Sequence, residues 1–275
     1  MTGRIVLVGT PIGNLGDLSA RAAEVLGSAD VLACEDTRRT GRLLAHLGVA
    51  APRLVRMDDH TEATVAPRLV AEARSGRLVA VATDAGMPGL SDPGGRLVAA
   101  AVEAGVAVEV VPGPFAGVVA AVVSGLLGPA GRFTFEGFLP RKGPERRDRL
   151  AEVAAERRAV VIYESPHRVA ATVADLALAC GPDRRVALCR ELTKLHEETW
   201  RGTLADAAEH LAAGARGEHV IVVEAAPPRG APSDEDVATA LSEELAAGST
   251  RRDAAAAVAR RLGVPANRVK RLANP

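Results

Sequence analysis

Three loops rich in glycine and proline lie in the first half of the chain, at residues 9–16, 83–94 and 112–114. Each follows a short apolar run that is typical of a buried strand. Open α/β sheets bind ligands at the carboxyl ends of their strands, so the three loops are expected to converge on one crevice. The glycines of the first loop follow neither the G-x-G-x-x-G spacing of dinucleotide sites nor the G-K-[ST] ending of a P-loop.

Two of these loops also carry groups that suit a polar ligand. Asp84 comes directly after a strand, among glycines that allow the backbone to approach a ligand closely. Residues 112–114 precede a helix expected at 115–124, whose free N–H groups can face an anion or a carboxylate. An alternative for Asp84 is a local role, in which its carboxylate caps its own loop.

The elements that position these loops alternate between strand and helix. In the first half we expect strands at 5–8, 31–34, 54–57, 78–82 and 106–111, and helices at 19–26, 40–47, 61–75 and 95–103. This alternation predicts a mostly parallel sheet that is covered on both faces.

The second part of the chain is less regular. We expect strands at 132–139, 159–163, 186–190, 197–202 and 218–224, and helices at 143–157, 166–179 and 204–212. Because some strands follow one another without a helix between them, this part predicts a mixed sheet. The resulting division is an α/β domain at 1–128, a second α/β domain at 129–226, and a linker with a helical domain at 227–275.

The tail differs in kind from the rest of the chain. Residues 225–232 are typical of a linker, and helices are expected at 237–246, 250–262 and 266–272. The last two helices flank a short turn, which fits a helix-turn-helix. From Ser249 onward there are seven Arg or Lys residues and one acidic residue, which favours contact with nucleic acid over a merely solvated face.

Composition bounds the class of protein. The chain has 275 residues, 48% of them apolar, and a formal net charge of zero, so a nucleic acid must be met by a local basic patch. Three scattered cysteines indicate reduced thiols and neither a disulfide framework nor a metal site. No signal peptide or run of about 20 apolar residues is visible, which predicts a cytoplasmic protein without a membrane partner.

Seven motifs in order carry a resemblance to a known family. They are 9–15 (GTPIGNL), 34–40 (CEDTRRT), 84–88 (DAGMP), 112–114 (PGP), 136–140 (EGFLP), 163–168 (YESPHR) and 190–194 (RELTK). The set closely resembles the bacterial 16S rRNA 2′-O-ribose cytidine methyltransferases, within the tetrapyrrole-methylase superfamily, over the whole chain. Cys34, Arg39 and Met87 stand where that family usually has Ala, His and Thr, and Met87 offers no hydroxyl to a ligand.

The resemblance implies a tetrapyrrole-methylase-like two-domain α/β fold with a small helical appendage. It also implies S-adenosylmethionine as methyl donor, a homodimer, and a cytidine of the decoding region of 16S rRNA in the 30S subunit as acceptor. The donor-binding residues that it implies are Pro11, Asp84, Ala85, Gly86, Met87, Phe115, Ala116, Leu139, Tyr163, Glu164, Glu191 and Leu192.

The catalytic residues remain open among five candidates. A ribose hydroxyl is a weak nucleophile, so a base or a cation near the forming alkoxide would accelerate the transfer. The candidates are Glu35, Asp36, Glu164, His167 and Lys194. Glu164 and Lys194 are favoured, because the motifs around them distinguish the rRNA branch of the superfamily. Asp36 can equally form an ion pair with a nearby arginine, and His167 suits a helix cap.

Basic residues in two regions are expected to contact RNA. They are Arg38, Arg39, Arg141, Lys142, Arg146, Arg147 and Arg168 in the body, and Arg251, Arg252, Arg268, Lys270 and Arg271 in the tail. Only 2% of the residues are aromatic, which argues against an open stacking platform and favours recognition of a folded RNA by shape.

Two other functions are alternatives to rRNA methylation. One keeps the fold and the donor but methylates a small tetrapyrrole precursor, which would need neither the basic tail nor the Arg-rich segment after Pro140. The other is a nucleic-acid-binding regulator that senses S-adenosylmethionine without turnover. The many converging motifs argue against a sensor.

Overall fold

The computed structural model describes residues 3–212, 214–228 and 232–272. The chain packs into two compact units, Met1–Ala226 and Pro227–Pro275, which are described separately below. Part of the expected linker, residues 229–231, lies outside the described residues.

The first sheet of the larger unit is entirely parallel, with strand order β3-β2-β4-β1-β5. Its strands are β1 (Arg4–Val8), β2 (Val31–Cys34), β3 (Arg53–Arg56), β4 (Leu78–Ala82) and β5 (Ala107–Val111). Successive residues of a strand face opposite sides, and this alternation decides which helices each side chain meets. The parallel sheet confirms the prediction from alternating strands and helices.

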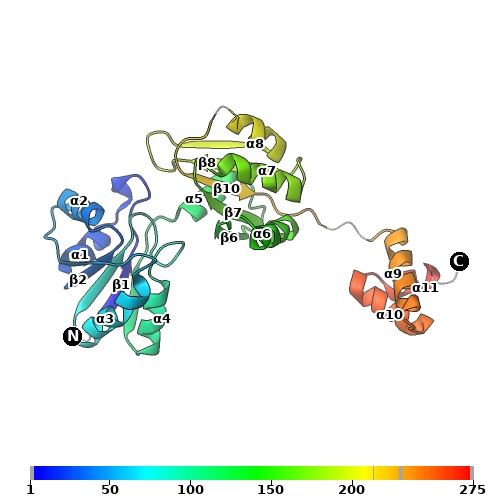
Figure 1. Cartoon of the computed structure of the whole chain (residues 1–275), viewed down its shortest axis with the longest axis horizontal. Helices are drawn as coiled ribbons and strands as arrows, with labels where there is room; N and C mark the ends of the chain where they lie inside the picture. The colour runs from blue at the N-terminus through cyan, green and yellow to red at the C-terminus, as the bar shows by residue number, and fades with distance from the viewer. Residues whose placement is uncertain (1–2, 213, 229–231, 273–275) are drawn as a thin grey trace. The chain divides into compact units, whose positions relative to one another are not determined.

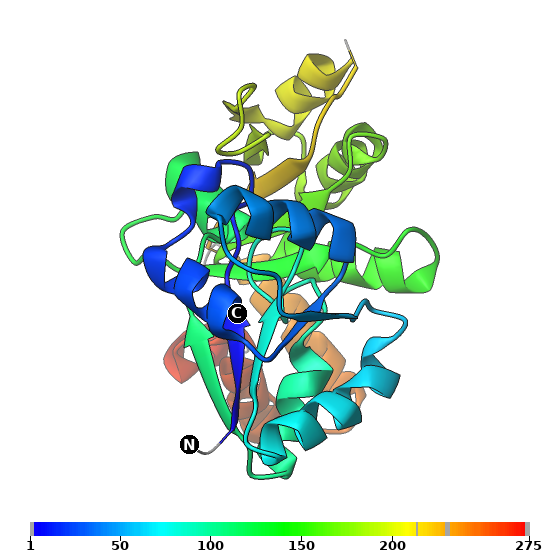
Figure 2. The ribbon, with the colours of Figure 1, turned by 90° about the vertical axis from the view of Figure 1, so that its left-hand side faces the viewer.

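Helices cover both faces of this sheet (Figures 1 and 2). Val6 and Val8 pack with the helices α1 (Ala20–Ser28) and α2 (Thr37–Leu47). Ile5, on the other face, packs with α3 (Glu62–Arg74) and α4 (Gly95–Glu103). The strand ends therefore leave the sheet as loops at one edge between two layers of helices.

Several element boundaries differ from the prediction by one to three residues, and two differences lie near the loops of the first sheet. Helix α2 begins at Thr37 and not at residue 40, because the carboxylate of Asp36 accepts hydrogen bonds from the amides of Arg38 and Arg39 at 2.8 and 3.4 Å. A short 3₁₀ helix at Leu15–Asp17, absent from the prediction, follows Asn14, whose side chain accepts from the Gly16 amide.

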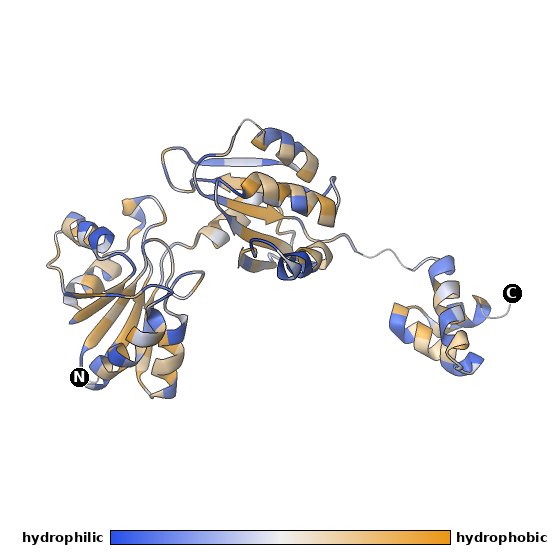
Figure 3. Cartoon of the chain, in the orientation of Figure 1, coloured by the Kyte–Doolittle hydropathy of each residue, from blue (hydrophilic) through white to orange (hydrophobic). Residues whose placement is uncertain are grey.

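The second sheet is mixed, as predicted, with strand order β6-β7-β10-β8-β9. Only the β6–β7 pair is parallel among the described pairings of this sheet. Its strands are β6 (Phe133–Phe138), β7 (Ala159–Glu164), β8 (Arg185–Arg190), β9 (Glu198–Thr203) and β10 (His219–Val223). The inner strands β7 and β10 are strongly apolar in Figure 3, whereas the edge strand β9 is pale to hydrophilic.

Helices also cover both faces of the second sheet. One face packs with α6 (Pro144–Ala155), α7 (Val169–Cys180) and α8 (Leu204–Leu211). The other face packs with α5 (Ala116–Ser124), the helix that follows the third loop. Helix α5 thereby carries the chain from the first sheet to the second.

The smaller unit consists of α9 (Asp234–Ala246), α10 (Arg251–Leu262) and α11 (Ala266–Leu272) around an apolar core of its own. Gly263 ends α10 in the left-handed conformation, with φ of 64°, which glycine adopts without strain. The α/β fold with a small helical tail is thus confirmed. No helix among the described residues is both long and apolar enough to cross a membrane.

Candidate functional site

The three loops meet at the carboxyl ends of the adjacent strands β4, β1 and β5. Thr10 and Gly86 exchange backbone hydrogen bonds at 2.9 and 3.1 Å, which joins the first loop to the second. The first and third loops approach so closely that a Cβ atom on Gly9 would lie 2.5 Å from the nitrogen of Gly113. The Gly113 amide also donates to the sulfur of Met87 at 3.3 Å.

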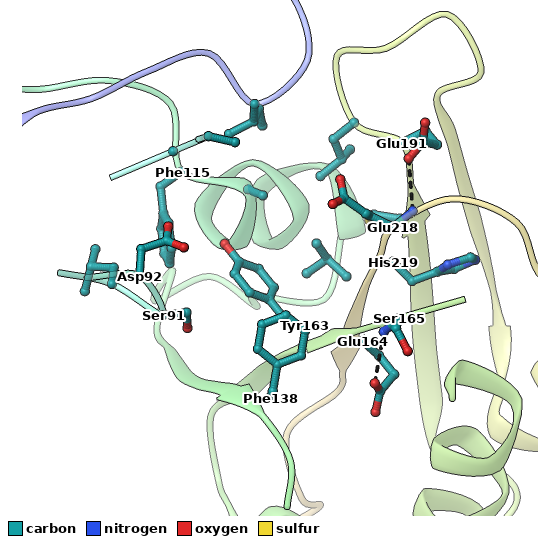
Figure 4. Close-up of a pocket in the computed structure, with 18 of the residues that line it drawn as sticks. Ser91, Asp92, Phe115, Phe138, Tyr163, Glu164, Ser165, Glu191, Glu218 and His219 are labelled. Atoms are coloured by element: carbon teal, nitrogen blue, oxygen red, sulfur yellow. Dashed lines mark hydrogen bonds between the residues drawn. The ribbon is translucent and has the colours of Figure 1, made fainter. Parts of the chain in front are cut away.

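A cavity of about 390 Å³ lies between these loops and the second sheet (Figure 4). Its apolar lining includes Ile12, Leu90, Phe115 and Leu192, and its polar lining includes Asp92, Glu191, Lys194, Glu218 and His219. The volume is within the range of small-molecule sites, which are mostly apolar with a few placed polar groups.

Most of the expected donor-binding residues line this cavity. They are Ala85, Gly86, Met87, Phe115, Ala116, Tyr163, Glu164, Glu191 and Leu192. Pro11, Asp84 and Leu139 do not line it. Pro11 is buried, Leu139 is 2% exposed within the core of the second sheet, and the carboxylate of Asp84 faces Arg39 at 3.2 Å.

Asp92 is an acid of the cavity that was not among the residues expected from the sequence. It lines the cavity and makes no hydrogen bond or ion pair with any residue that the structure describes. Burial, together with the negative charges of Glu35, Asp59 and Asp84, raises its pKa to about 7. The sequence places Asp84 and Asp92 in the same loop, and the structure distinguishes them, because Asp84 pairs with Arg39 and Asp92 lines the cavity.

The opposite wall of the cavity holds one cation between two carboxylates. The Lys194 ammonium donates to Glu191 at 3.0 Å and to Glu218 at 2.7 Å. Burial opposes the charged form of Lys194, but these hydrogen bonds outweigh it and raise its pKa. Lys194 is therefore an ammonium at neutral pH, which favours a role as a cation over one as a base.

Unusual backbone conformations cluster around the cavity. Among the described residues, the non-glycine residues with positive φ are Ser91, Glu191 and Thr193, at 61°, 50° and 65°. The hydroxyl of Thr193 accepts a hydrogen bond from the amide of Asn14 at 3.1 Å, which ties the first loop to the second sheet. Strained conformations of this kind persist where the surrounding structure enforces them, often at binding sites.

The carboxylate of Glu164 is buried within a hydrogen-bond network. It accepts from the Ser165 amide at 2.9 Å and from the Thr172 hydroxyl at 2.7 Å, and it pairs with Arg168 at 3.3 Å. Figure 4 shows it turned away from Phe115 and Asp92. These contacts favour a role in shaping the cavity wall over the proton transfer expected for Glu164.

Arg146 belongs to the same network. It is 8% exposed and donates to Asp175, to the Thr172 hydroxyl at 3.1 Å and to the Pro140 carbonyl at 2.8 Å. This burial argues against the RNA contact expected for Arg146. Arg168 is also partly engaged, because it donates to the Leu139 carbonyl at 2.9 Å.

The remaining basic residues divide into paired and exposed groups. Arg38 and Arg39 pair with Asp36 and Asp84, and Arg268 pairs with Asp234. The exposed residues, which form no ion pair with the described part of the chain, are Arg141, Lys142, Arg147, Arg251, Arg252, Lys270 and Arg271.

The other catalytic candidates lie outside the cavity lining. Asp36 caps α2, and His167 is exposed. Burial raises the pKa of Glu35, which accepts a hydrogen bond from the Asp84 amide at 3.4 Å. No group of acids, histidines and cysteines in the described residues is arranged to hold a metal ion.

The contact between Gly9 and Gly113 can be tested by a glycine-to-alanine pair. Gly9→Ala is expected to reduce the free energy of unfolding by about 1–3 kcal/mol, because its methyl group meets backbone atoms that cannot rotate away. Gly41→Ala, within α2 and with open space around it, is the control and is expected to stabilise by up to about 1 kcal/mol. Denaturant unfolding measures both. Equal stability of Gly9→Ala and the wild type would contradict the close approach.

Comparison with known proteins agrees with this architecture. Residues 4–208 match the family model of tetrapyrrole (corrin/porphyrin) methylases. A solved structure of uroporphyrin-III C-methyltransferase from Thermus thermophilus, complexed with S-adenosylhomocysteine, is 25% identical with a TM-score of 0.57, covering 80% of this chain and 97% of that one. A structure of diphthine synthase, 16% identical with a TM-score of 0.61 over 80% of this chain and 89% of that one, shares the fold.

Curated relatives extend over nearly the whole chain. A protein of Mycobacterium tuberculosis named ribosomal RNA small subunit methyltransferase I is 46% identical over 94% of this chain and 90% of its own length. A protein of Synechocystis with the same name is 40% identical over 98% of this chain and 97% of its own. With the family model matching residues 4–208, the chain belongs to the tetrapyrrole methylase family.

Proposed function

We propose that this protein transfers a methyl group from S-adenosylmethionine to the ribose 2′-hydroxyl of a cytidine in the decoding region of 16S rRNA, on the assembled 30S subunit. The observation that carries the choice of acceptor is the near full-length similarity to relatives named for small-subunit rRNA methylation. The cavity between the two sheets supports the choice of donor, because it pairs an apolar slot with acidic groups suited to a cation.

The residues of the cavity fit the proposed donor. Its apolar side chains suit an adenine ring, and Asp92 is a carboxylate without a partner among the described residues, free to pair with an ammonium or sulfonium group. S-adenosylmethionine supplies a methyl group that its sulfonium centre already activates. Tyr163 stays a neutral phenol, because burial raises its pKa to about 12, and its oxygen accepts from the Gly117 amide at 3.0 Å.

The chain contributes alignment and electrostatics to the transfer. The strained loops hold the cavity walls in place, so that an acceptor hydroxyl can be presented in line with the methyl group. Lys194 places a positive charge at the wall of the cavity, where it can stabilise negative charge that develops on the 2′-oxygen. Glu164 acts through the wall that it shapes and is a positioning residue.

Contact with the ribosomal subunit is assigned to the exposed basic residues. Arg141, Lys142 and Arg147 come shortly after the cavity-lining residue Phe138 in the sequence, and Arg251 and Arg252 begin α10 of the tail. The acceptor is a ribosomal subunit, so the place of action is the cytoplasm. We further infer a homodimer from the family resemblance, and light scattering of the purified protein tests it.

Methyl transfer from labelled donor to parallel acceptors tests the function. The acceptors are methylation-deficient 30S subunits, naked 16S rRNA and a tetrapyrrole precursor, with nuclease digestion and mass spectrometry of the products. We expect 2′-O-methylcytidine with 30S subunits alone. Label in the macrocycle and none in RNA would overturn the acceptor.

The same assay examines Lys194. Lys194→Met keeps the length of the side chain and removes its charge, so kcat is expected to decrease by about 10²-fold if the ammonium stabilises the transition state. Calorimetric titration with S-adenosylmethionine serves as the control. A loss confined to donor affinity would assign Lys194 to donor binding.

The pH dependence of donor binding tests Asp92. Its pKa of about 7 in the free protein means that raising the pH from 6 to 7.5 ionises it and strengthens pairing with a positively charged donor. If only ionised Asp92 binds the donor, the Kd for S-adenosylmethionine is expected to decrease about eightfold between these two pH values. Asp92→Asn should bind weakly with little dependence on pH. An unchanged pH profile in this variant would assign the titration to another group.

Removal of the tail separates acceptor contact from donor binding. The larger unit, Met1–Ala226, contains every residue of the cavity lining. A chain that ends at Ala226 is therefore expected to retain its donor Kd within about twofold, while KM for 30S subunits increases about tenfold and becomes less dependent on salt. Loss of donor affinity would mean that the tail stabilises the body of the protein.

A further inference from the structure

The aromatic residues of this chain are few and unevenly placed. The sequence holds six, and four of them, Phe115, Phe135, Phe138 and Tyr163, contact one another beside the cavity. Three of these rings are partly buried, whereas Phe138 is 56% exposed and also lines the cavity. Phe138 therefore presents an apolar surface to solvent at the cavity. Packing in a hydrophobic core does not explain the presence of an aromatic ring at this position.

Contacts with Tyr163 and a bulge at Gly137 fix the position of Phe138. Its ring lies edge-to-face against Tyr163, with centroids 5.6 Å apart, and Tyr163 packs in turn on Phe135. Figure 4 shows Phe138 directly beside Tyr163, at the end of β6. The preceding Gly137 has φ of 61°, at a bulge in the pairing of β6 with β7, which re-aims the strand end.

The chain that follows Phe138 is anchored by two arginines. Arg168 donates to the Leu139 carbonyl at 2.9 Å, and Arg146 donates to the Pro140 carbonyl at 2.8 Å. Both arginines are fixed in turn through Glu164 and Thr172. This network fixes the backbone that follows Phe138, so a rigid segment holds the ring.

Two exposed cationic side chains come shortly after Phe138 in the sequence. Arg141 and Lys142 are exposed and form no ion pair with the part of the chain that the structure describes. A flat apolar ring at a cavity, followed by free positive charge, matches an unpaired nucleotide: a base that can stack and phosphates that can pair with cations.

We propose that Phe138 is the surface on which one unpaired base of the acceptor RNA stacks, with Arg141 and Lys142 contacting the adjoining phosphates. The proposal rests on the proposed function and names how the same site holds its acceptor. Stacking of one base would place its ribose over the cavity that holds the donor. The low aromatic content argued against an extended stacking platform, but a single base needs only one exposed ring.

The test compares Phe138→Leu, which keeps an apolar side chain without a ring, with Phe138→Trp, which keeps a ring. Leu178→Ala is the control, because Leu178 is 87% exposed on α7 and does not line the cavity. Methylation of 30S subunits gives kcat and KM, and calorimetric titration gives the Kd for S-adenosylmethionine. Thermal unfolding of each variant reports on the fold.

Loss of one stacking contact is expected to increase KM for 30S subunits about tenfold in Phe138→Leu. The donor Kd should stay within about twofold, and Phe138→Trp and Leu178→Ala should resemble the wild type. An unchanged KM in Phe138→Leu, or a loss that falls on the donor Kd, would overturn the proposal. Failure of the proposed function is distinguishable, because the wild type itself would then leave 30S subunits unlabelled.

Discussion

The close backbone contact between Gly9 and Gly113 is the constraint on which the rest of the site depends. Adjacent parallel strands end at the same edge of a sheet, but their loops can share one floor only where side chains do not separate them. With no Cβ on either residue, the first and third loops touch, and the Gly113 amide reaches the sulfur of Met87. The Thr10–Gly86 bridge then completes a continuous wall from three strand ends.

A second constraint is that buried charges need partners. Glu164 and Arg146 are both nearly inaccessible, and Thr172 connects them through its hydroxyl. Removing one member of such a network leaves the others desolvated, so these residues determine the shape of the cavity wall. The same network explains why Arg146 turns inward while Arg141 and Lys142, a few residues earlier, remain in solvent.

Charge pairing also decides which acids can meet a ligand. Asp84 and Asp92 share one loop, but one carboxylate oxygen of Asp84 pairs with Arg39, whereas Asp92 faces the cavity among other negative charges. The opposite wall balances one ammonium, that of Lys194, with the carboxylates of Glu191 and Glu218. The cavity therefore offers a cation-attracting side and a side with mixed charge, which suits the zwitterionic donor proposed above.

The sequence by itself determined the order of elements and the parallel and mixed sheets, because apolar periodicity and glycine-rich strand ends are local signals. The family resemblance of its motifs supplied nine of the residues that line the cavity. Its motifs also led to the family. Tertiary structure alone decided which side chains a ligand can reach: that Asp92 and not Asp84 faces the cavity, that Arg146 is internal, and that Phe138 is exposed. These outcomes depend on partners distant in the chain, such as Arg39 for Asp84 and Thr172 for Arg146, and no local pattern encodes such pairings.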